Sequence, residues 1–475
     1  MTLQLDAVGR YVADAWRGAI LPALERFIAI PALSPSFDSD WEAHGHLASA
    51  AELVAEWCRH RPIEGLAVDV VRLPGRTPVV VVEVAPFGTA APDDAVVLYG
   101  HYDKQPEMTG WREGLGPWTP VVDGERLYGR GGADDGYSAF ASLVAIEAVQ
   151  ASGGSHARCI LLVEGSEESG SSDLSAYIDA LGARIGQPRL VVCLDSGALD
   201  YERLWVTTSL RGLVGGTLTV EILEEGVHSG TASGIVPDSF RIARSLLDRI
   251  EDATTGAVRL EACYVDIPED RQQEAEAAAD VLGRLPSVEF PFAPDAGPVT
   301  DDPVGQLLGR TWAPALTVTG ADGLPPTTKA GNVLRPSTSL RLSMRLPPTC
   351  DADVALDAIR SALLTDPPYG VSVSFDRIEA AGGWNAPAFA GWLRLALDHA
   401  SAECFGALAA AYGDGGSIPF MGMLGARYPD AQFVITGVLG PRSNAHGPNE
   451  FLDLPLGRAV TVTIASVLDA HTRRP

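Results

Sequence analysis

The order of hydrophobic and polar residues predicts helices and buried strands in alternation over the first part of the chain. Four segments carry apolar residues at helical spacing, which predicts helices; they are 11–30, 48–59, 138–150 and 174–181. Four short runs rich in Val, Ile and Leu predict buried strands; they are 78–84, 95–99, 159–163 and 189–194. This alternation predicts an α/β domain in which a mixed sheet has helices on both faces.

The pattern changes from about Gly212, where apolar and polar residues alternate along the predicted strands. Further strands of this kind and their helices are predicted at 237–252, 338–346, 352–364 and 370–378. Half-exposed strands beside helices predict a smaller, two-layer α+β domain.

Helix and buried-strand patterns resume at Ala386, with a strand at 434–439 and a last helix at 459–471. The two patterns therefore predict an insertion. Residues 1–208 and 386–475 form the large domain, and residues 209–385 form the smaller domain inserted into it.

The composition excludes several classes of partner. With 61 acidic against 35 basic residues the net charge is -26, so the chain repels nucleic acid and anionic membranes. The six cysteines include no C-x-x-C pair, which favours a reducing compartment. The N-terminus lacks the regions of a signal peptide, and no uncharged apolar stretch reaches the roughly 20 residues that span a bilayer. We therefore predict a cytoplasmic protein.

Candidate chemistry gathers at five strand ends and loops. In the stretch GHYD, His101 and Asp103 lie two residues apart, so both side chains point to one side of an extended segment. The other segments are GGADDG with Asp134 and Asp135, EGSEESG with Glu167 and Glu168, LDSG with Asp195, and NAHGPNE with His446. Sheets of α/β proteins build their sites at such positions.

Each segment alone also has a structural explanation. Glu167 and Glu168 can cap the helix that follows them, and Asp134 can cap another. His101 and Asp103 can belong to a solvated loop edge. Together, however, the histidines and carboxylates form a nitrogen and oxygen donor set suited to Zn²⁺, Co²⁺ or Mn²⁺. The coincidence of five such segments favours a metal site.

Two other enzyme classes are disfavoured by their motifs. The run from Gly129 to Asp134 is close to the dinucleotide fingerprint G-x-G-x-x-G, but an aspartate stands at the third glycine position, where it would face a pyrophosphate. No G-x-S-x-G motif occurs, which argues against a serine hydrolase of the α/β type.

The ordered motifs GHYD, LYGRGGADD, EGSEESG, LDSG, HSG, GGSIP and AHGPNE resemble the M20 family of metallopeptidases, and most of all its carnosinase-like dipeptidase branch. The resemblance covers nearly the whole chain. It implies a zinc-peptidase-like α/β catalytic domain with an inserted ferredoxin-like α+β domain, which serves as a lid and for dimerisation in a homodimer. This fold agrees with the architecture that the hydrophobic pattern predicts.

The resemblance also implies two divalent metal ions, most readily zinc, with manganese or cobalt as alternatives. It assigns His101 and Asp195 to one ion, Glu168 and His446 to the other, and Asp134 as the carboxylate that bridges both. It implies further that the peptide bond between Asp134 and Asp135 is cis. Asp103 would accept a hydrogen bond from His101 and fix its tautomer. Glu167 would be the general base.

Substrate-binding residues follow from the same resemblance. His228, in GVHSG, is expected to reach the site of a partner subunit and stabilise charge on the carbonyl oxygen. Arg345, Asn332 and Ser417 are expected to anchor a substrate carboxylate. Two of them also have ordinary explanations, since His228 can be a lid-surface histidine and Arg345 a sheet-surface arginine.

The sequence departs from the dipeptidase branch at two positions. Ala381 replaces a histidine that usually precedes the paired glycines, which puts a free C-terminal dipeptide in doubt and makes Trp384 a candidate for an apolar pocket. Gly136 replaces a lysine that often follows the paired aspartates. Lys104, beside the first motif, is a candidate substrate contact.

Two classes of function remain. The favoured one is a metal-dependent hydrolase that cleaves an amide bond of a small substrate, as a dipeptidase or as an aminoacyl deacylase acting on an N-acyl amino acid or another amide. The alternative is a non-catalytic scaffold that keeps metal for folding or partner binding. Glu167 argues against the scaffold, because a carboxylate that is not a ligand has no use there.

Overall fold

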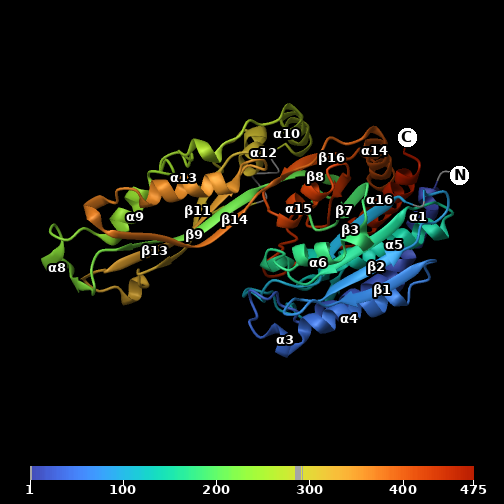
Figure 1. The fold of residues 1–475 in the computed structure, drawn as a ribbon, viewed down its shortest axis with the longest axis horizontal. Coiled ribbons are helices and arrows are strands. Elements are labelled where there is room, and N and C mark those ends of the chain that lie inside the picture. The colour runs from blue at the N-terminus through green and yellow to red at the C-terminus, as the bar shows by residue number, and fades with distance from the viewer. Residues whose placement is uncertain (1–2, 92, 284–289, 291, 475) are drawn as a thin grey trace.

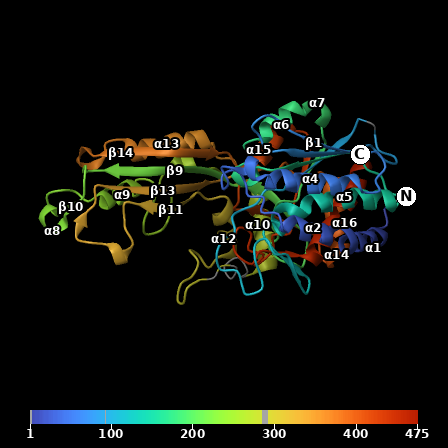
Figure 2. The same ribbon diagram turned by 90° about the horizontal axis from the view of Figure 1, so that it is seen from below.

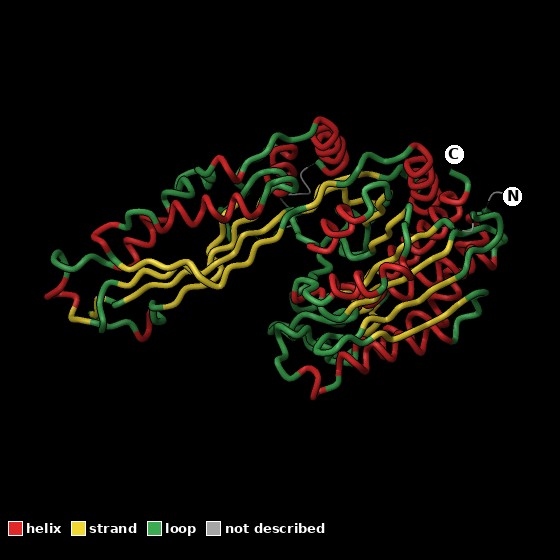
Figure 3. Tube along the Cα trace, in the orientation of Figure 1, coloured by secondary structure: helices red, strands yellow, loops and turns green. Residues whose placement is uncertain are grey.

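The computed structural model describes residues 3–91, 93–283, 290 and 292–474. The chain forms two lobes that lie end to end (Figure 1). We call the lobe that carries both termini the body. The other lobe, the lid, is formed by residues 212–265 and 315–381 and is an elongated sheet with helices along one side (Figures 1 and 3).

The body is built on a six-stranded mixed sheet in the order β1-β2-β6-β3-β7-β17. Its strands are β1 Leu66–Val71, β2 Val79–Val84, β3 Ala95–His101, β6 Arg158–Glu164, β7 Leu190–Cys193 and β17 Gln432–Ile435. β6, β3, β7 and β17 are parallel neighbours. Toward the other edge, β2 runs antiparallel to both of its neighbours, β6 and β1. The carboxyl ends of β6, β3 and β7 therefore meet at one edge of the sheet.

Helices cover both faces of this sheet (Figure 2). Successive strand residues point to opposite faces, so Val96 and Leu98 pack in one hydrophobic core and Val97 and Tyr99 in another. The first core holds α1 Leu5–Ala15, α2 Leu21–Ile28, α4 His46–Arg59, α5 Tyr137–Ala151, α14 Gly391–Phe405 and α16 Leu454–Thr472. The second holds α6 Leu174–Ala180, α7 Gly182–Ile185 and α15 Pro419–Arg427. The short helix α3 is Trp41–His44.

The lid contains a four-stranded antiparallel sheet in the order β11-β13-β9-β14. Its strands are β9 Gly212–Glu221, β11 Ala315–Asp322, β13 Ser337–Leu346 and β14 Ser372–Ala381, and its helices are α8 Ser229–Ala232, α9 Ser239–Leu247 and α13 Ala352–Leu364. The chain order β9, α9, β11, β13, α13, β14 gives the ferredoxin-like arrangement. β13 is buried at every second residue, as its alternating pattern predicts.

The distal end of the lid carries a two-stranded ribbon of β10 Val227–His228 and β12 Val333–Leu334. Three 3₁₀ turns complete the lid, at Glu261–Cys263, Thr327–Lys329 and Pro368–Gly370. In Figure 2, β10 and α8 lie at the opposite end of the molecule from the two termini.

Two small sheets complete the body. One joins β8 Trp205–Leu210, β15 Trp384–Asn385 and β16 Ala410–Asp414. The pairing of Leu210 with Trp384 places both connections to the lid side by side. The other joins β4 Val121–Asp123, β5 Arg126–Tyr128 and β18 Phe451–Asp453.

Aspartates begin several of the helices. Asp453 accepts a hydrogen bond from the backbone N–H of Leu456 at the start of α16, and a proline stands in that first turn. Asp302 and Asp351 cap α12 (Pro303–Thr311) and α13 in the same way.

Several elements differ in detail from the sequence prediction. The helix predicted at 11–30 is α1 and α2 joined by a π-helical turn, Trp16–Ile20. The strand predicted at 434–439 ends at Ile435. Helices α10 (Glu269–Leu282) and α12 fall within the predicted insertion yet pack against β16 of the body. The exact domain boundaries stay a prediction. Across the described residues, we find no helix with the length and apolar character needed to span a membrane.

Candidate metal centre and active site

The residues singled out in the sequence converge at one edge of the body sheet. His101 ends β3, and Asp195 follows β7. Glu167 and Glu168 begin the 3₁₀ turn Glu167–Ser169 after β6. Because β6, β3 and β7 are parallel neighbours, these three strand ends carry their polar groups to the same place. Asp134 reaches it from the turn Gly132–Gly136 before α5, and His446 from the loop between β17 and β18.

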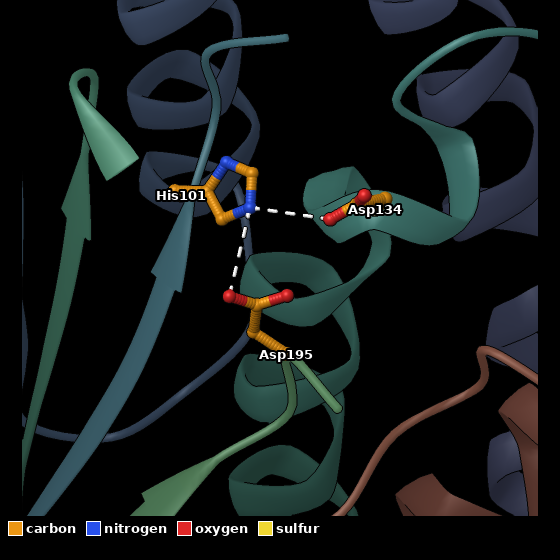
Figure 4. A group of neighbouring side chains, drawn as sticks. All are labelled: His101, Asp134 and Asp195. Atoms are coloured by element: carbon orange, nitrogen blue, oxygen red, sulfur yellow. Dashed lines mark ion pairs between the residues drawn. The ribbon is translucent and has the colours of Figure 1, made fainter. Parts of the chain in front are cut away.

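One group of possible metal ligands consists of His101, Asp134 and Asp195 (Figure 4). Nε2 of His101 lies 3.5 Å from Oδ1 of Asp134 and 3.8 Å from Oδ2 of Asp195. This nitrogen is buried and has no hydrogen-bond partner in the described part of the chain. A buried nitrogen that faces two carboxylates at these separations is suited to binding a cation.

A second group consists of Asp134, Glu168 and His446. Nε2 of His446 lies 3.0 Å from Oδ2 of Asp134 and 3.4 Å from Oε2 of Glu168. Asp134 therefore belongs to both groups, with one oxygen toward each histidine. The peptide bond between Asp134 and Asp135 is cis, as the resemblance implied.

The other ring nitrogen of His101 is held by Asp103. Nδ1 lies 3.1 Å from the backbone carbonyl oxygen of Asp103 and 3.4 Å from its carboxylate. The carboxylate also accepts hydrogen bonds from the backbone N–H groups of Glu167 and Glu168. Hydrogen bonding at Nδ1 leaves Nε2 free to face the two carboxylates.

The concentration of carboxylates changes the acidities in this centre. Burial raises the pKa of Glu168 to about 8, and the Asp134 charge adds to the effect. Burial and the neighbouring Asp195 raise the pKa of Glu167 well above its usual range. Burial opposes the charged form of Asp134 too, but the neighbouring imidazoles of His101 and His446 outweigh it and lower its pKa. An uncompensated excess of negative charge of this kind favours bound cations.

A cavity of about 330 Å³ opens beside these groups. Glu167, Glu168 and His446 line it together with Asp414, Ser417 and Ile418. Its position next to the ligand groups makes it the candidate substrate pocket.

The expected carboxylate anchor is assembled only in part within one chain. Nη1 of Arg345, on β13, donates a hydrogen bond to Oγ of Ser417 at 2.9 Å, and this hydroxyl donates to the backbone carbonyl of Arg211. Asn332 instead lies beside His228 at the distal end of the lid, where its carbonyl accepts from the N–H of Ser229. The structure therefore does not bring Asn332 or His228 to the metal centre of their own chain.

Two predictions about other residues, Lys104 and Trp384, are wrong. Lys104 is fully buried, and its ammonium group donates to the carbonyl oxygens of Phe27, Ile28 and Ile30, so it cannot contact substrate. Trp384 packs against Phe433 in the core beneath the sheet and does not line the cavity.

Sequence reasoning missed three residues that support the centre. Nε2 of Gln105 donates to Oε2 of Glu168 at 2.6 Å. Arg130 and Glu450 form a buried ion pair behind Asp134 and His446. All three lie inside or directly after motifs that the sequence analysis used, but nothing in those motifs shows which partner each residue has.

The chain resembles known proteins in both sequence and fold. The sequence profile of peptidase family M20/M25/M40 matches residues 97–470. The cysteinylglycine-S-conjugate dipeptidase of Corynebacterium striatum is 29% identical over 422 residues, which are 86% of this chain and 87% of that protein. The structure of the dipeptidase Dug1p from Saccharomyces cerevisiae has a TM-score of 0.79 at 20% identity, covering 100% of both chains. Human carnosine dipeptidase 1 has a TM-score of 0.76 at 20% identity, covering 99% of this chain and 100% of its own.

Proposed function

Because this chain belongs to peptidase family M20/M25/M40, in its carnosinase-like branch of metallodipeptidases, we propose that it hydrolyses the amide bond of a dipeptide at two divalent cations. The proposed ligands are His101 and Asp195 for one cation, Glu168 and His446 for the other, and Asp134 for both. The observation that carries the proposal is that Asp134 belongs to both ligand groups, with one oxygen toward each histidine.

The chemistry of these residues fits such cations. The buried Nε2 of His101 lacks a hydrogen-bond partner among the described residues, and the carboxylates around it repel one another in the absence of positive charge. Imidazole nitrogens with carboxylate oxygens suit Zn²⁺, Mn²⁺ and Co²⁺. We propose zinc as the bound metal, with manganese and cobalt as the alternatives.

Glu167 is the proposed general base. It lines the cavity next to both ligand groups but belongs to neither of them. When bound, the cations would lower the pKa of a water molecule and polarise the substrate carbonyl. The Glu167 carboxylate would accept the proton of the attacking water and deliver it to the leaving amine.

The Arg345 and Ser417 pair is proposed to bind the carboxylate of the substrate. The two side chains are already joined by a hydrogen bond, and Ser417 lines the same cavity as Glu167 and His446. Relatives of this chain are dipeptidases for Cys-Gly and β-Ala-His, so these dipeptides are the first substrates to test. A deacylase acting on N-acyl amino acids is the second candidate, because Ala381 stands where a histidine is expected for dipeptides.

The test is a substrate panel with chelator-treated protein reconstituted with Zn²⁺, Mn²⁺ or Co²⁺. Cys-Gly, β-Ala-His and an N-acetyl amino acid separate the two candidates. We expect metal-dependent hydrolysis of a dipeptide, and we expect Glu167→Gln to lower kcat by about 10²- to 10⁴-fold, the range for a lost general acid or base.

Glu164→Gln is the matched control. Glu164 ends β6, the strand that precedes Glu167. Burial raises the pKa of Glu164 to about 7. Its carboxylate, however, accepts hydrogen bonds from Tyr99, Ser166 and Ser171. This variant should keep most of the activity. Activity that survives Glu167→Gln would exclude Glu167 as the base, and hydrolysis of none of the substrates would favour the scaffold.

We also propose that the protein works as a cytoplasmic homodimer. The six cysteines are free thiols, five of them buried, which suits a reducing compartment. His228 and Asn332 lie too far along the lid to serve the centre of their own chain in this arrangement, so a second chain would have to supply them (Figure 2).

A further inference from the structure

A buried ion pair between Arg130 and Glu450 lies behind the metal centre. Nη1 of Arg130 lies 2.6 Å from Oε2 of Glu450, and the two side chains are 1% and 0% exposed. Arg130 follows β5 and Glu450 precedes β18, which are paired strands. The backbone N–H of Gly129 also donates to the carbonyl of Glu450. The pair therefore joins two segments that lie more than 300 residues apart in sequence.

Glu450 holds the turn that carries Asp134. Its second oxygen, Oε1, accepts hydrogen bonds from the backbone N–H groups of Gly131 at 3.0 Å, Ala133 at 3.3 Å and Asp134 at 3.3 Å. A carboxylate that accepts three backbone donors fixes the path of this turn, because buried N–H groups need acceptors.

Arg130 donates hydrogen bonds to two segments outside that turn, one with Gly447 and one with Pro106. Its Nη2 donates to the carbonyl of Gly447, directly after His446, at 2.8 Å, and its Nε donates to the carbonyl of Pro106 at 3.2 Å. The planar guanidinium presents these donors in a fixed geometry, which an ammonium group cannot reproduce.

The His446 loop needs such support. Arg442, Asn444, His446 and Asn449 all have φ between 57° and 67°, the left-handed region that non-glycine residues rarely adopt. The His446 side chain is also 54% exposed, whereas those of His101, Asp134, Asp195 and Glu168 are at most 8% exposed. His446 is therefore the proposed ligand whose position depends most on its loop.

We infer that the Arg130–Glu450 pair is a positioning device that sets the affinity of the Asp134, Glu168 and His446 group for its cation. This inference rests on the metal centre proposed above. The pair acts through the backbone N–H of Asp134 and through the carbonyl of Gly447, the residue after His446. Asp195 follows a strand of the central sheet and His101 ends another, so the affinity of their group depends less on the pair.

The test is titration of chelator-treated protein with Zn²⁺ in competition with a chromophoric chelator. The wild-type chain should bind two ions. In Glu450→Gln, one ion should bind about 10- to 100-fold more weakly, the range for groups that orient metal ligands, while the other ion, which shares Asp134 but also has His101 and Asp195, should lose less affinity. If that variant yields no folded protein, Arg130→Lys addresses the same point, because it keeps the positive charge but loses the fork of donors.

A matched ion pair away from the centre separates positioning from general stability. Arg61 donates two hydrogen bonds to Glu147, and their side chains are 15% and 3% exposed. Arg61→Met should lower the urea midpoint of the metal-free protein and leave both Zn²⁺ affinities unchanged. Two tight ions in both Glu450→Gln and Arg130→Lys would overturn the inference, as would an equal loss of affinity in Arg61→Met. A wild-type chain that binds no Zn²⁺ would instead overturn the metal centre itself.

Discussion

The carboxylate of Asp103 orients both sides of the metal centre without belonging to either ligand group. Oδ1 accepts from the backbone N–H of Glu167 at 3.1 Å, and Oδ2 accepts from that of Glu168 at 3.0 Å. The same Oδ1 lies 3.4 Å from Nδ1 of His101. Asp103 is fully buried, so the backbone N–H groups of Glu167 and Glu168 depend on this carboxylate as their acceptor.

Asp103→Asn is expected to lower kcat and Zn²⁺ affinity by about 10- to 100-fold. The amide NH₂ is a donor, so at least one of the surrounding N–H groups loses its acceptor. Zn²⁺ titration and steady-state kinetics measure the two effects. Asp173→Asn is the control, because Asp173 likewise accepts from the backbone N–H and hydroxyl of Thr77, outside the centre. Equal losses in both variants would contradict the role given to Asp103.

His101 and Lys104 show what could be predicted about single residues. The period of two along a strand was enough to place His101 and Asp103 on one side of their segment. It could not show that a backbone carbonyl lies closer to Nδ1 than the carboxylate does, because that depends on how the chain turns after β3. Lys104 was misjudged because its carbonyl partners, from Phe27 to Ile30, lie more than 70 residues away in sequence.

Elements with a strong apolar signal were predictable, and those without one were not. β3 and α5 lie close to their predicted ranges because nearly all their residues are buried. α10 was missed because its sequence, EDRQQEAEAAADVL, is mostly charged residues and alanines, which carry little apolar signal. The interruption between α1 and α2 was also invisible, since a π-helical turn keeps the apolar residues close to helical spacing.

The last turn of α16 buries His471 without giving its ring nitrogens a hydrogen-bond partner among the described residues. Its Nδ1 lies 3.5 Å from Oδ2 of Asp94. Arg474 donates to both oxygens of Asp94, so that carboxylate is already compensated. Burial therefore lowers the pKa of His471 to about 4, although Asp94 opposes the shift.

Protonation of His471 should consequently lower the stability of the fold in acid. The unfolded chain binds a proton to His471 near the ordinary pKa of about 6.5, and the folded chain does so only near 4. The free energy of unfolding therefore decreases as pH falls between these values, by up to about 3 kcal/mol. His471→Phe removes this contribution, so its urea unfolding should change less between pH 7 and pH 4.5 than that of the wild type. His60→Phe, at an exposed position, is the control; an unchanged pH dependence in His471→Phe would contradict the prediction.

The position of the lid relative to the body was the feature least predictable from the sequence. The insertion was predictable from the change in strand pattern at Gly212 and Ala386. The length of the lid, and hence the distance of its tip from the centre, depends on how four strands of up to ten residues align in register. Asn332 and Arg345, which the resemblance placed in one anchor, are separated in the chain by most of β13, so only a second chain could bring them together.

Exchange of lids between chains can be tested by mixing two inactive variants. His228→Ala should lose about 10²- to 10³-fold in kcat, the range for a lost donor to the carbonyl oxygen. Glu167→Gln should be inactive for a different reason, since it lacks the base. If His228 serves the partner subunit's site, each mixed dimer has one complete site, and random reassociation of equal amounts should restore about a quarter of the wild-type activity. Glu167→Gln mixed with Asp134→Asn is the control, because both substitutions fall in the same chain's half of a site and no complete site can form. Activity no higher than the sum of the separate variants would contradict the exchange of His228 between chains, which is expected because β10 lies at the end of the lid away from the body (Figure 2).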